Sequence, residues 1–245
     1  MANNFGALTD HFSIATTDLI LVESSKTPVA ESRAEARDEN GDIAAVTYYG
    51  NDGGAICDAS CTYLLKSGTL KLDSLQVGEL ATGVLVESIE IATSNGDWPK
   101  VTVSGKLGMA AVQAPTGSTA KATLPAGIDI LGKKQAQVMG FTVGSGCKLT
   151  SCSMSVAASI TQADDGLGEP VAYAVSFDIA TVTAEFVRIT EQPSWTPGTA
   201  LIETQAPSTV EPQAAYHTST ATGEIPITRD AALVTTTTTT TTATT

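Results

Sequence analysis

The chain of 245 residues has few of the residues that usually build catalytic sites, since it contains two histidines and four cysteines. The histidines, His11 and His217, fall in an expected N-terminal arm and an expected C-terminal tail, where no rigid network would position a general base. The sequence also lacks a Gly-x-Ser-x-Gly elbow and a Walker-type phosphate loop. We therefore expect a protein that is not an enzyme, with no catalytic residues and no cofactor.

Positive charge is also scarce. Lys and Arg together number 13 against 26 Asp and Glu, which gives a formal net charge of −13. The only adjacent basic pair in the first 190 residues is Lys133-Lys134, and a surface that grips phosphates needs many more cations. This composition argues against tight nucleic-acid binding, although it allows a surface that lets nucleic acid pass without sticking. A plainer reading is that the acidity keeps the protein soluble.

Long apolar runs are absent. The start, Met-Ala-Asn-Asn-Phe, has neither a basic region nor an apolar segment of the kind found in signal peptides. No apolar run approaches the roughly 20 residues that span a bilayer as a helix. We expect no membrane partner, and a product that stays in the cytoplasm unless it is exported as part of something larger.

The residues that could hold a metal are poorly spaced for it. Cys57 and Cys61 lie four apart and Cys147 and Cys152 five apart, whereas a zinc site needs four converging thiolates that are usually more tightly spaced. We expect reduced thiols, with a structural zinc or a disulfide as alternatives. The acidic stretch Asp38–Asp42 does not fit a calcium loop, because the sixth and twelfth positions hold no Gly and no Glu. We expect no metal site.

The strongest pattern that is present is an alternation of apolar and small polar residues from Ser151 to Glu185. Two ten-residue arms of period two flank an Asp164-Asp165-Gly166 turn, which is typical of two long antiparallel strands. The predicted core face comprises Cys152, Met154, Val156, Ala158 and Ile160 in one arm and Val171, Tyr173, Val175, Phe177 and Ile179 in the other. The candidate assembly residues lie on the opposite polar face: Ser153, Ser155, Ser159, Thr161, Ser176 and Asp178.

Further strands are indicated on both sides of this hairpin. Phe12–Glu23 is strand-like, with Ile14, Leu19, Leu21 and Val22 as candidate core residues. Asn40-Gly41 and Asn95-Gly96 predict hairpins with type I′ turns, in which both central residues have positive φ. The apolar phase slips near Glu87-Ser88 and again near Ala180-Thr181, which predicts a β-bulge at each place.

These patterns predict an all-β fold, an antiparallel sandwich or barrel with long hairpins and at most one or two short helices. We expect an N-terminal arm over residues 1–11, a β domain over 12–190, and a Pro- and Thr-rich low-complexity tail over 191–245. Such a tail buries too little apolar surface to offset its ordering entropy, so we expect disorder there. An alternative is that 201–204 or 224–228 adds a strand to a neighbouring molecule.

Two stretches of the sequence resemble virion structural proteins of tailed bacteriophages. One is Ala34-Glu35-Ala36-Arg37-Asp38-Glu39-Asn40-Gly41-Asp42-Ile43 followed by Tyr48-Tyr49-Gly50. The other, Glu169-Pro170-Val171-Ala172-Tyr173 after an acidic turn, is similar to the long hairpin of phage tail tube proteins. The resemblance covers about residues 12–190 and rests on turn-plus-strand patterns that recur in many β proteins.

The resemblance implies a structural role without catalytic residues. Tail tube proteins form rings, commonly of six subunits, that stack into a hollow cylinder whose long strands join into one continuous inner barrel. It would place this chain in the virion, assembled in the cytoplasm of a bacterial host, with itself and other tail or head proteins as partners and DNA only as passing cargo. The small polar strand face would suit a water-filled bore, and the negative charge would suit a conduit that repels DNA. The Thr-rich end has no counterpart in this picture.

Two other readings stay open. A capsid decoration or head–tail connection protein would be equally β-rich and acidic. A non-catalytic β-sandwich that binds carbohydrate or a cell surface would need exposed aromatic residues on a concave face, and most of the few aromatics here fall in the core phase of strands.

Overall fold

The computed structural model is almost entirely β, which confirms the predicted fold class. It describes residues 8–29, 32–49, 56–78, 80–81, 83–109, 122–123, 127–143, 145–166, 170–176, 179–188, 195–197, 203–204, 208–209, 217–226 and 228–229. The helical element among them is a single 3-10 turn, η2 (Leu72–Ser74). The sheet that dominates the molecule is antiparallel throughout and has ten strands.

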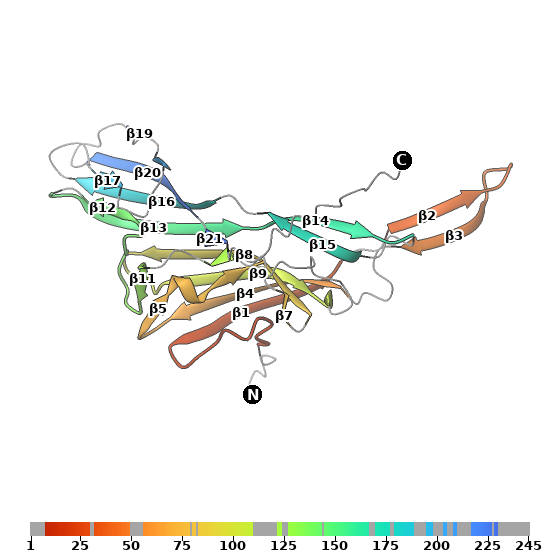
Figure 1. The fold of residues 1–245 in the computed structure, drawn as a ribbon, viewed down its shortest axis with the longest axis horizontal. Helices are drawn as coiled ribbons and strands as arrows, with labels where there is room; N and C mark the ends of the chain where they lie inside the picture. Colours follow the sequence, from red (N-terminus) through yellow and green to blue (C-terminus); the bar gives the residue numbers. More distant parts are fainter. Residues whose placement is uncertain are drawn as a thin grey trace, which may run out of the picture.

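The large sheet runs in the order β1-β4-β9-β8-β13-β16-β20-β18, with β7 pairing β8 and β19 pairing β20 off this path (Figure 1). Its strands are β1 (Leu19–Pro28), β4 (Cys57–Leu65), β7 (Leu80–Ala81), β8 (Val84–Ser94), β9 (Lys100–Leu107), β13 (Lys148–Ala157), β16 (Ile179–Arg188), β18 (Glu203–Thr204), β19 (Ser208–Thr209) and β20 (His217–Pro226). β8 and β9 are consecutive in the chain and pair as a hairpin, whereas β4 pairs with β9 and β8 with β13 although these strands are distant in the chain.

Five smaller sheets complete the fold. Two of them are ribbons that extend beyond the large sheet: β2 (Ser32–Arg37) with β3 (Ile43–Tyr49), and β14 (Ser159–Asp164) with β15 (Pro170–Ser176). The others are β5 (Thr69–Lys71) with β11 (Asp129–Leu131), β12 (Phe141–Val143) with β17 (Trp195–Pro197), and the set β6 (Gln76–Val77), β10 (Ala122–Thr123) and β21 (Thr228–Arg229).

The core lies on one face of the large sheet. Alternate residues of neighbouring strands are fully buried there, from Tyr63 on β4 through Val103 and Ile91 to Met154 and Phe186. Side chains of the connecting segments cover this face and belong to the same apolar cluster, which includes Leu72, Leu75, Val77, Ile130 and Met139. A second, smaller apolar cluster of Leu85 and Met109, against which Ile56 and Ile160 pack, lies apart from this core near the bulged end of β8, where Leu85 pairs with Lys106.

The predicted bulge in β8 is confirmed. The register between β8 and β9 shifts between Val86 and Ser88, so Glu87 is the extra residue. A second bulge was not predicted: the register between β1 and β4 shifts between Leu21 and Glu23. Val22 is the extra residue there and is 41% exposed. The prediction that Val22 belongs to the core is therefore wrong, because a bulge reverses the side of the sheet that a residue faces.

The Ser151–Glu185 hairpin forms, but each arm is divided. Its basal strands β13 and β16 pair inside the large sheet, while its distal strands β14 and β15 pair only with each other. Ser155 pairs with Thr181, and Ser159 pairs with Ser176. Residues 156–158 separate the two pairs in the first arm and residues 177–180 in the second, so the second arm has one extra residue. The predicted slip therefore occurs, but before the expected position at Ala180-Thr181, because β16 pairs with β20 without a register shift from Ile179 to Arg188 and Ala180 is already buried in phase with Val182.

The predicted core face holds only for the basal half of this hairpin. Cys152, Met154 and Val156 are buried, and so are Ala180 and Val182, which follow the slip. Val171 in β15 is 43% exposed instead, because the distal ribbon has left the large sheet, and only its base contacts apolar residues in the described part of the chain, where Ile160 packs against Leu85 and Met109. Phe177 lies outside the described residues.

The Asn-Gly hairpins form, but not with the expected turn. Gly41 has a φ of +86° and Gly96 of +93°, whereas neither Asn has a positive φ. In the first hairpin Gly41 N–H bonds to Asp38 O and Asp38 N–H bonds to Asp42 O. This is a type I turn closed by a glycine bulge, so the type I′ prediction is wrong: only one position needs the left-handed region.

The tail prediction is wrong for residues 217–226. They form β20, which pairs along its full length with β16 and buries Ala221 and Ile225 against the core. The stretch was missed because its strand is made mainly of Thr, Ala and Gly, whose hydrophobic signal is weak. Residues 230–245, including the poly-Thr run, lie outside the described part of the chain.

Candidate assembly surface

The open face of the large sheet is built mainly of serine and threonine. Residues that pair directly across two antiparallel strands lie on the same face of the sheet. The pairing register therefore shows which residues of each neighbouring strand belong to the open face. Ser153, for example, pairs with Ala92 on β8 and with Thr183 on β16, which in turn pairs with Thr222 on β20. The hydroxyl residues on this face are Ser60, Thr62, Ser88, Ser94, Thr102, Ser104, Ser151, Ser153, Ser155, Thr181, Thr183, Thr218, Thr220 and Thr222.

Several of these hydroxyl groups bond to one another across strands. The Oγ1 atoms of Thr62 and Thr102 are 3.4 Å apart, and Ser104 Oγ donates to Ser60 Oγ at 3.2 Å. Ser151 Oγ donates to the Glu185 carboxylate at 2.9 Å. Short side chains that satisfy each other make a polar surface of low relief, without the aromatic residues that would stack on a sugar ring or a base.

The charges on the same face are mainly negative. Lys106 bonds to Asp58 at 2.8 Å and lies 3.9 Å from the carboxylate of Glu87. Burial raises the pKa of Glu87. The positive charge of Lys106 opposes this rise, and the negative charge of Asp58 adds to it. By register the charged residues on the open face are Glu23, Asp58, Glu90, Glu185, Glu203 and Glu224 against Lys100, Lys106 and Lys148.

The candidate assembly residues are split between two regions. Ser153 and Ser155 lie on the open face of the large sheet, whereas Thr161 is exposed on the β14–β15 ribbon. Ser159 and Ser176 pair directly at the base of that ribbon. Asp178 lies outside the described residues. The interruption between β13 and β14 therefore divides the predicted polar face.

The β14–β15 ribbon is attached to the sheet at this interruption. Ala158 N–H bonds at 2.7 Å to the carbonyl of Glu87, the bulge residue of β8. Next to it Ile160 packs against a small apolar cluster formed by Leu85 and Met109. The bulge in β8 therefore lies next to the break between β13 and β14. The carbonyl of the bulge residue Glu87 accepts the hydrogen bond that fixes Ala158, where the ribbon begins.

A carboxylate that the sequence analysis overlooked ties the N-terminal segment to the core. Asp10 accepts N–H groups of Phe12, Ser13 and Ala15, and the buried Tyr63 hydroxyl donates to it at 2.5 Å. Burial alone would raise the pKa of Asp10, but these four donors outweigh it and lower that pKa. Residue 10 is thus bonded to the domain although the sequence placed it in a loose arm, and nothing in the local sequence shows the distant partner.

The cysteines and histidines do not assemble into a reactive centre in the described part of the chain. All four cysteines are buried, and burial raises the pKa of Cys152 to about 12. His217 starts β20 opposite Arg188, far in the chain from the half-buried His11. Among the described residues no group of three or more His, Cys, Asp or Glu side chains converges as metal ligands would.

The chain matches no protein-family model and no curated protein. In the described residues, no helix has the length and apolar character needed to cross a membrane.

Proposed function

We propose that this protein is a structural virion subunit that self-assembles into rings, stacked as a phage tail tube that conducts DNA. The observation that carries the proposal is the difference between the two faces of the large sheet. One face is buried in the core, and the other presents a broad surface of small hydroxyl residues and carboxylates. A wall that lines an aqueous bore for DNA needs this chemistry, because it is wetted, offers few cations to phosphates, and has little relief to obstruct passage.

The edges of the sheet support assembly with further copies. β1 is a ten-residue strand at the end of the strand order, and among the described residues nothing pairs with its outer edge. At the opposite edge, the part of the chain that the structure describes pairs β20 with the two-residue strands β18 and β19. Closing a ring would pair such edges between subunits and remove the hazard of exposed backbone groups. We take a hexamer as the expected ring.

The proposal assigns no catalytic role, no cofactor and no metal to the chain, and it places the protein in the virion with tail or head proteins as neighbours. A capsid decoration or head–tail connection protein is the main alternative, since a β-rich acidic subunit suits either role. The open face carries no described aromatic residue in its hydroxyl ladder, which makes the carbohydrate-binding alternative weaker.

Electron microscopy of the purified full-length protein tests the proposal. Rings with a central hole, or hollow tubes, are expected at high protein concentration. Monomers or compact trimers at every concentration would count against a tail tube and favour a decoration protein. Specific binding on a glycan array would favour the carbohydrate-binding reading instead.

A further inference from the structure

Five of the 13 basic residues of this acidic chain lie at one end of the large sheet. The turn that joins β8 to β9, residues 95–99, is held there by backbone hydrogen bonds to three other segments. Leu65 N–H bonds to Pro99 O at 3.0 Å, Asn95 N–H to Thr150 O at 3.1 Å, and Gly96 N–H to Lys134 O at 3.4 Å. Four segments that are distant in the sequence therefore meet at this turn.

Each of these segments brings exposed lysines. We call the set of Lys66, Lys100, Lys133, Lys134 and Lys148 the lysine end; all five side chains are exposed. The acidic residue within the same turn is Asp97, and Asp18 lies next to Lys66, whose N–H bonds to the Asp18 carbonyl. Lys134 Nζ stands 5.5 Å from the ring centre of Trp98, which holds that lysine at the surface.

Side-chain hydrogen bonds give the lysine end a fixed shape. Asn95 donates from Nδ2 to Leu149 O at 2.8 Å and accepts Ala136 N–H at 3.0 Å. Close by, Thr93 accepts the N–H of Gln137 at 3.0 Å, and the Gln137 side chain bonds to both backbone groups of Leu131 at 2.7 Å. The loop that carries Lys133 and Lys134 is thus pinned to the sheet.

The opposite end of the molecule is acidic. The β2–β3 and β14–β15 ribbons extend from that end of the large sheet (Figure 1). We call their exposed turn residues Asp38, Glu39, Asp42, Asp164 and Asp165 the acidic tips. The molecule is therefore electrically polar along its length, with carboxylates on the ribbons and lysines at the far end.

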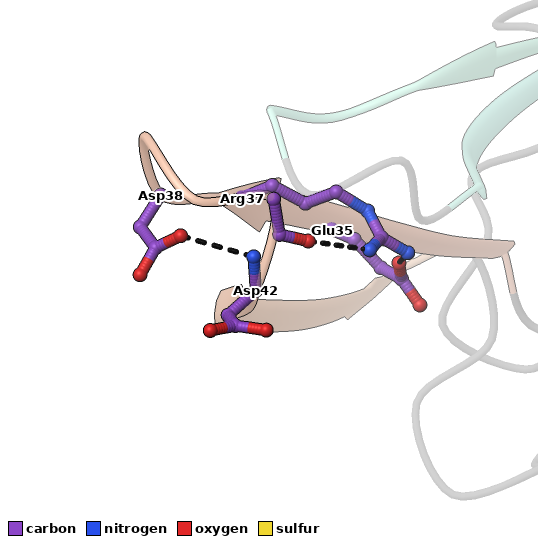
Figure 2. Close-up of polar contacts among 5 residues, drawn as sticks. Glu35, Arg37, Asp38 and Asp42 are labelled. Carbon is purple, nitrogen blue, oxygen red and sulfur yellow. Dashed lines mark hydrogen bonds and ion pairs between the residues drawn. The ribbon is translucent and has the colours of Figure 1, made fainter.

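Figure 2 shows how the first tip holds its carboxylates. Arg37, the nearest described cation, is engaged by Glu35 and by the Gly41 carbonyl, each at 2.8 Å. Asp38 accepts the N–H of Asp42 at 2.9 Å, which fixes the turn. The charges of Asp38 and Asp42 therefore point outward from a defined loop, available to a cation outside this chain.

We propose that the lysine end binds the acidic tips of a second copy of this chain, so that copies associate end to end. The inference rests on the proposed self-assembly and names the contact that extends it along one axis. Charge complementarity selects the second copy as the occupant, because the same chain presents both signs at opposite ends. Such a head-to-tail contact does not close on a pair of molecules, so it continues into a filament or a stack.

The contact has an apolar component as well. Ile43, Val46 and Val171 are exposed large apolar residues, and all three lie on the two ribbons. An isolated two-stranded ribbon is marginally stable in water, so a neighbour that covers these side chains would stabilise both ribbons. Exposed ion pairs each contribute little and are screened by salt, so the association should weaken as ionic strength rises.

A charge-swap experiment on the full chain tests the inference. One variant carries Lys133→Glu and Lys134→Glu, and the other carries Asp38→Lys and Glu39→Lys. Each alone should raise the concentration needed for end-to-end assembly by about tenfold or more, equal to about 1.4 kcal/mol. Mixed in equal amounts, they should assemble again, because each variant then meets an end of opposite charge on the other. Lys71→Glu on β5 is the control, because this exposed lysine belongs neither to the lysine end nor to the β1 edge, and the variant should assemble as the unaltered protein does.

Electron microscopy and sedimentation velocity read the outcome, and circular dichroism checks that each variant is folded. Stacks that neither variant weakens would overturn the inference and leave the proposed function standing, whereas rings that never stack would overturn both. An unaltered protein that forms no oligomer would overturn both. A labelled DNA duplex serves as the competing occupant: if it binds at 0.15 M salt and the Lys133/Lys134 variant loses that binding while assembly is unchanged, nucleic acid and not a second copy occupies the lysine end.

Discussion

Gly105 on β9 shows how the bulge in β8 restricts a single residue. It lies in phase with Val101 and Val103 on the buried face, where a larger side chain would be expected. A Cβ atom added at this position would lie 2.0 Å from the carbonyl oxygen of Leu85, a backbone atom of the neighbouring strand. The bulged strand therefore approaches β9 too closely for any side chain.

Gly105→Ala should for this reason destabilise the protein by about 3 kcal/mol, near the upper end of overpacking costs. Gly166→Ala is the matched control, since nothing lies within 4 Å of a Cβ added there and its backbone is not left-handed. Chemical denaturation of both variants measures the two changes. A control that costs as much as Gly105→Ala would contradict the steric explanation.

Asp10 should make stability depend on pH in a defined direction. Its pKa in the folded protein is lowered from 3.8, so the folded state favours the carboxylate form. The resulting stabilisation is present above pH 3.8 and is lost as pH falls through the lower, folded-state pKa. Asp10→Asn should therefore cost about 1 to 2 kcal/mol near neutral pH, in line with hydrogen bonds to a charged group.

The difference between the unaltered protein and Asp10→Asn should shrink below pH 3.8, because protonated Asp10 then resembles the amide. Denaturation curves at neutral pH and at about pH 3 measure this difference, and comparing the two proteins cancels the titration of other carboxylates. A gap of the same size at both pH values would show that the charge of Asp10 does not hold the N-terminal segment.

At the scale of elements, β20 is the strand whose role is easiest to test. It covers β16 along its whole length, so removing it would expose Val182 and Phe186 at the edge of the core. A chain that ends at residue 216 should lose at least about 3 kcal/mol, because burying one large apolar side chain is worth about 1.5 to 3 kcal/mol. Thermal unfolding followed by circular dichroism measures the loss.

A chain that ends at residue 229 is the matched control. It keeps β20 and β21 but lacks the poly-Thr end, which sequence composition predicts to be unstructured. Its melting temperature should stay within a few degrees of the full-length value. If the shorter chain that lacks β20 were equally stable, the strand would be an accessory and not part of the folded domain.

The two long hairpins share a design at this scale. In each, the basal strands belong to the large sheet and the distal strands form a free ribbon: β1 and β4 lead to β2–β3, and β13 and β16 lead to β14–β15. Period two continues through a distal ribbon even where no core lies beneath it. The pattern therefore identified both hairpins correctly but could not show where each one leaves the sheet.

At the scale of the whole molecule, the open face predicts where positive charge would capture nucleic acid. Ser155 and Thr181 pair with each other, are exposed, and lie near the middle of that face. Ser155→Lys with Thr181→Lys should leave the fold intact, because surface changes of this kind usually alter stability by less than about 0.5 kcal/mol. Assembled tubes of this variant should retain a short fluorescent oligonucleotide, since the added cations would line the proposed bore.

Co-sedimentation of the oligonucleotide with assembled protein measures this retention, and the unaltered protein should show none. Asp129→Lys, an exposed position on β11 outside the open face, the lysine end and the acidic tips, is the control, because it makes the same change in net charge on another surface. If the two variants retained the oligonucleotide equally, the open face would not be an enclosed bore. Weakened retention at high salt is expected for any contact with phosphates.

The candidate site was predictable in chemistry but not in extent. Period two marked Ser153 and Ser155 as polar residues opposite a core face, which is where they lie. The sequence could not show that Thr102, Thr183 and Thr222 continue the same face, because strand order depends on which segments pair. The lysine end was missed for the same reason: its members are scattered in the chain and meet only at the β8–β9 turn.

The sequence by itself determined the all-β class, the hairpins, the bulge at Glu87 and the polarity of each strand face, because these follow from period-two patterning and turn residues that act over a few positions. Only the tertiary structure decided that the Thr-rich stretch 217–226 is a strand of the large sheet, that Asp10 is bonded to Tyr63, and that lysines from four distant segments meet around the β8–β9 turn. These outcomes depend on contacts between residues distant in the chain, and the free energy of such contacts has no local signature in the sequence.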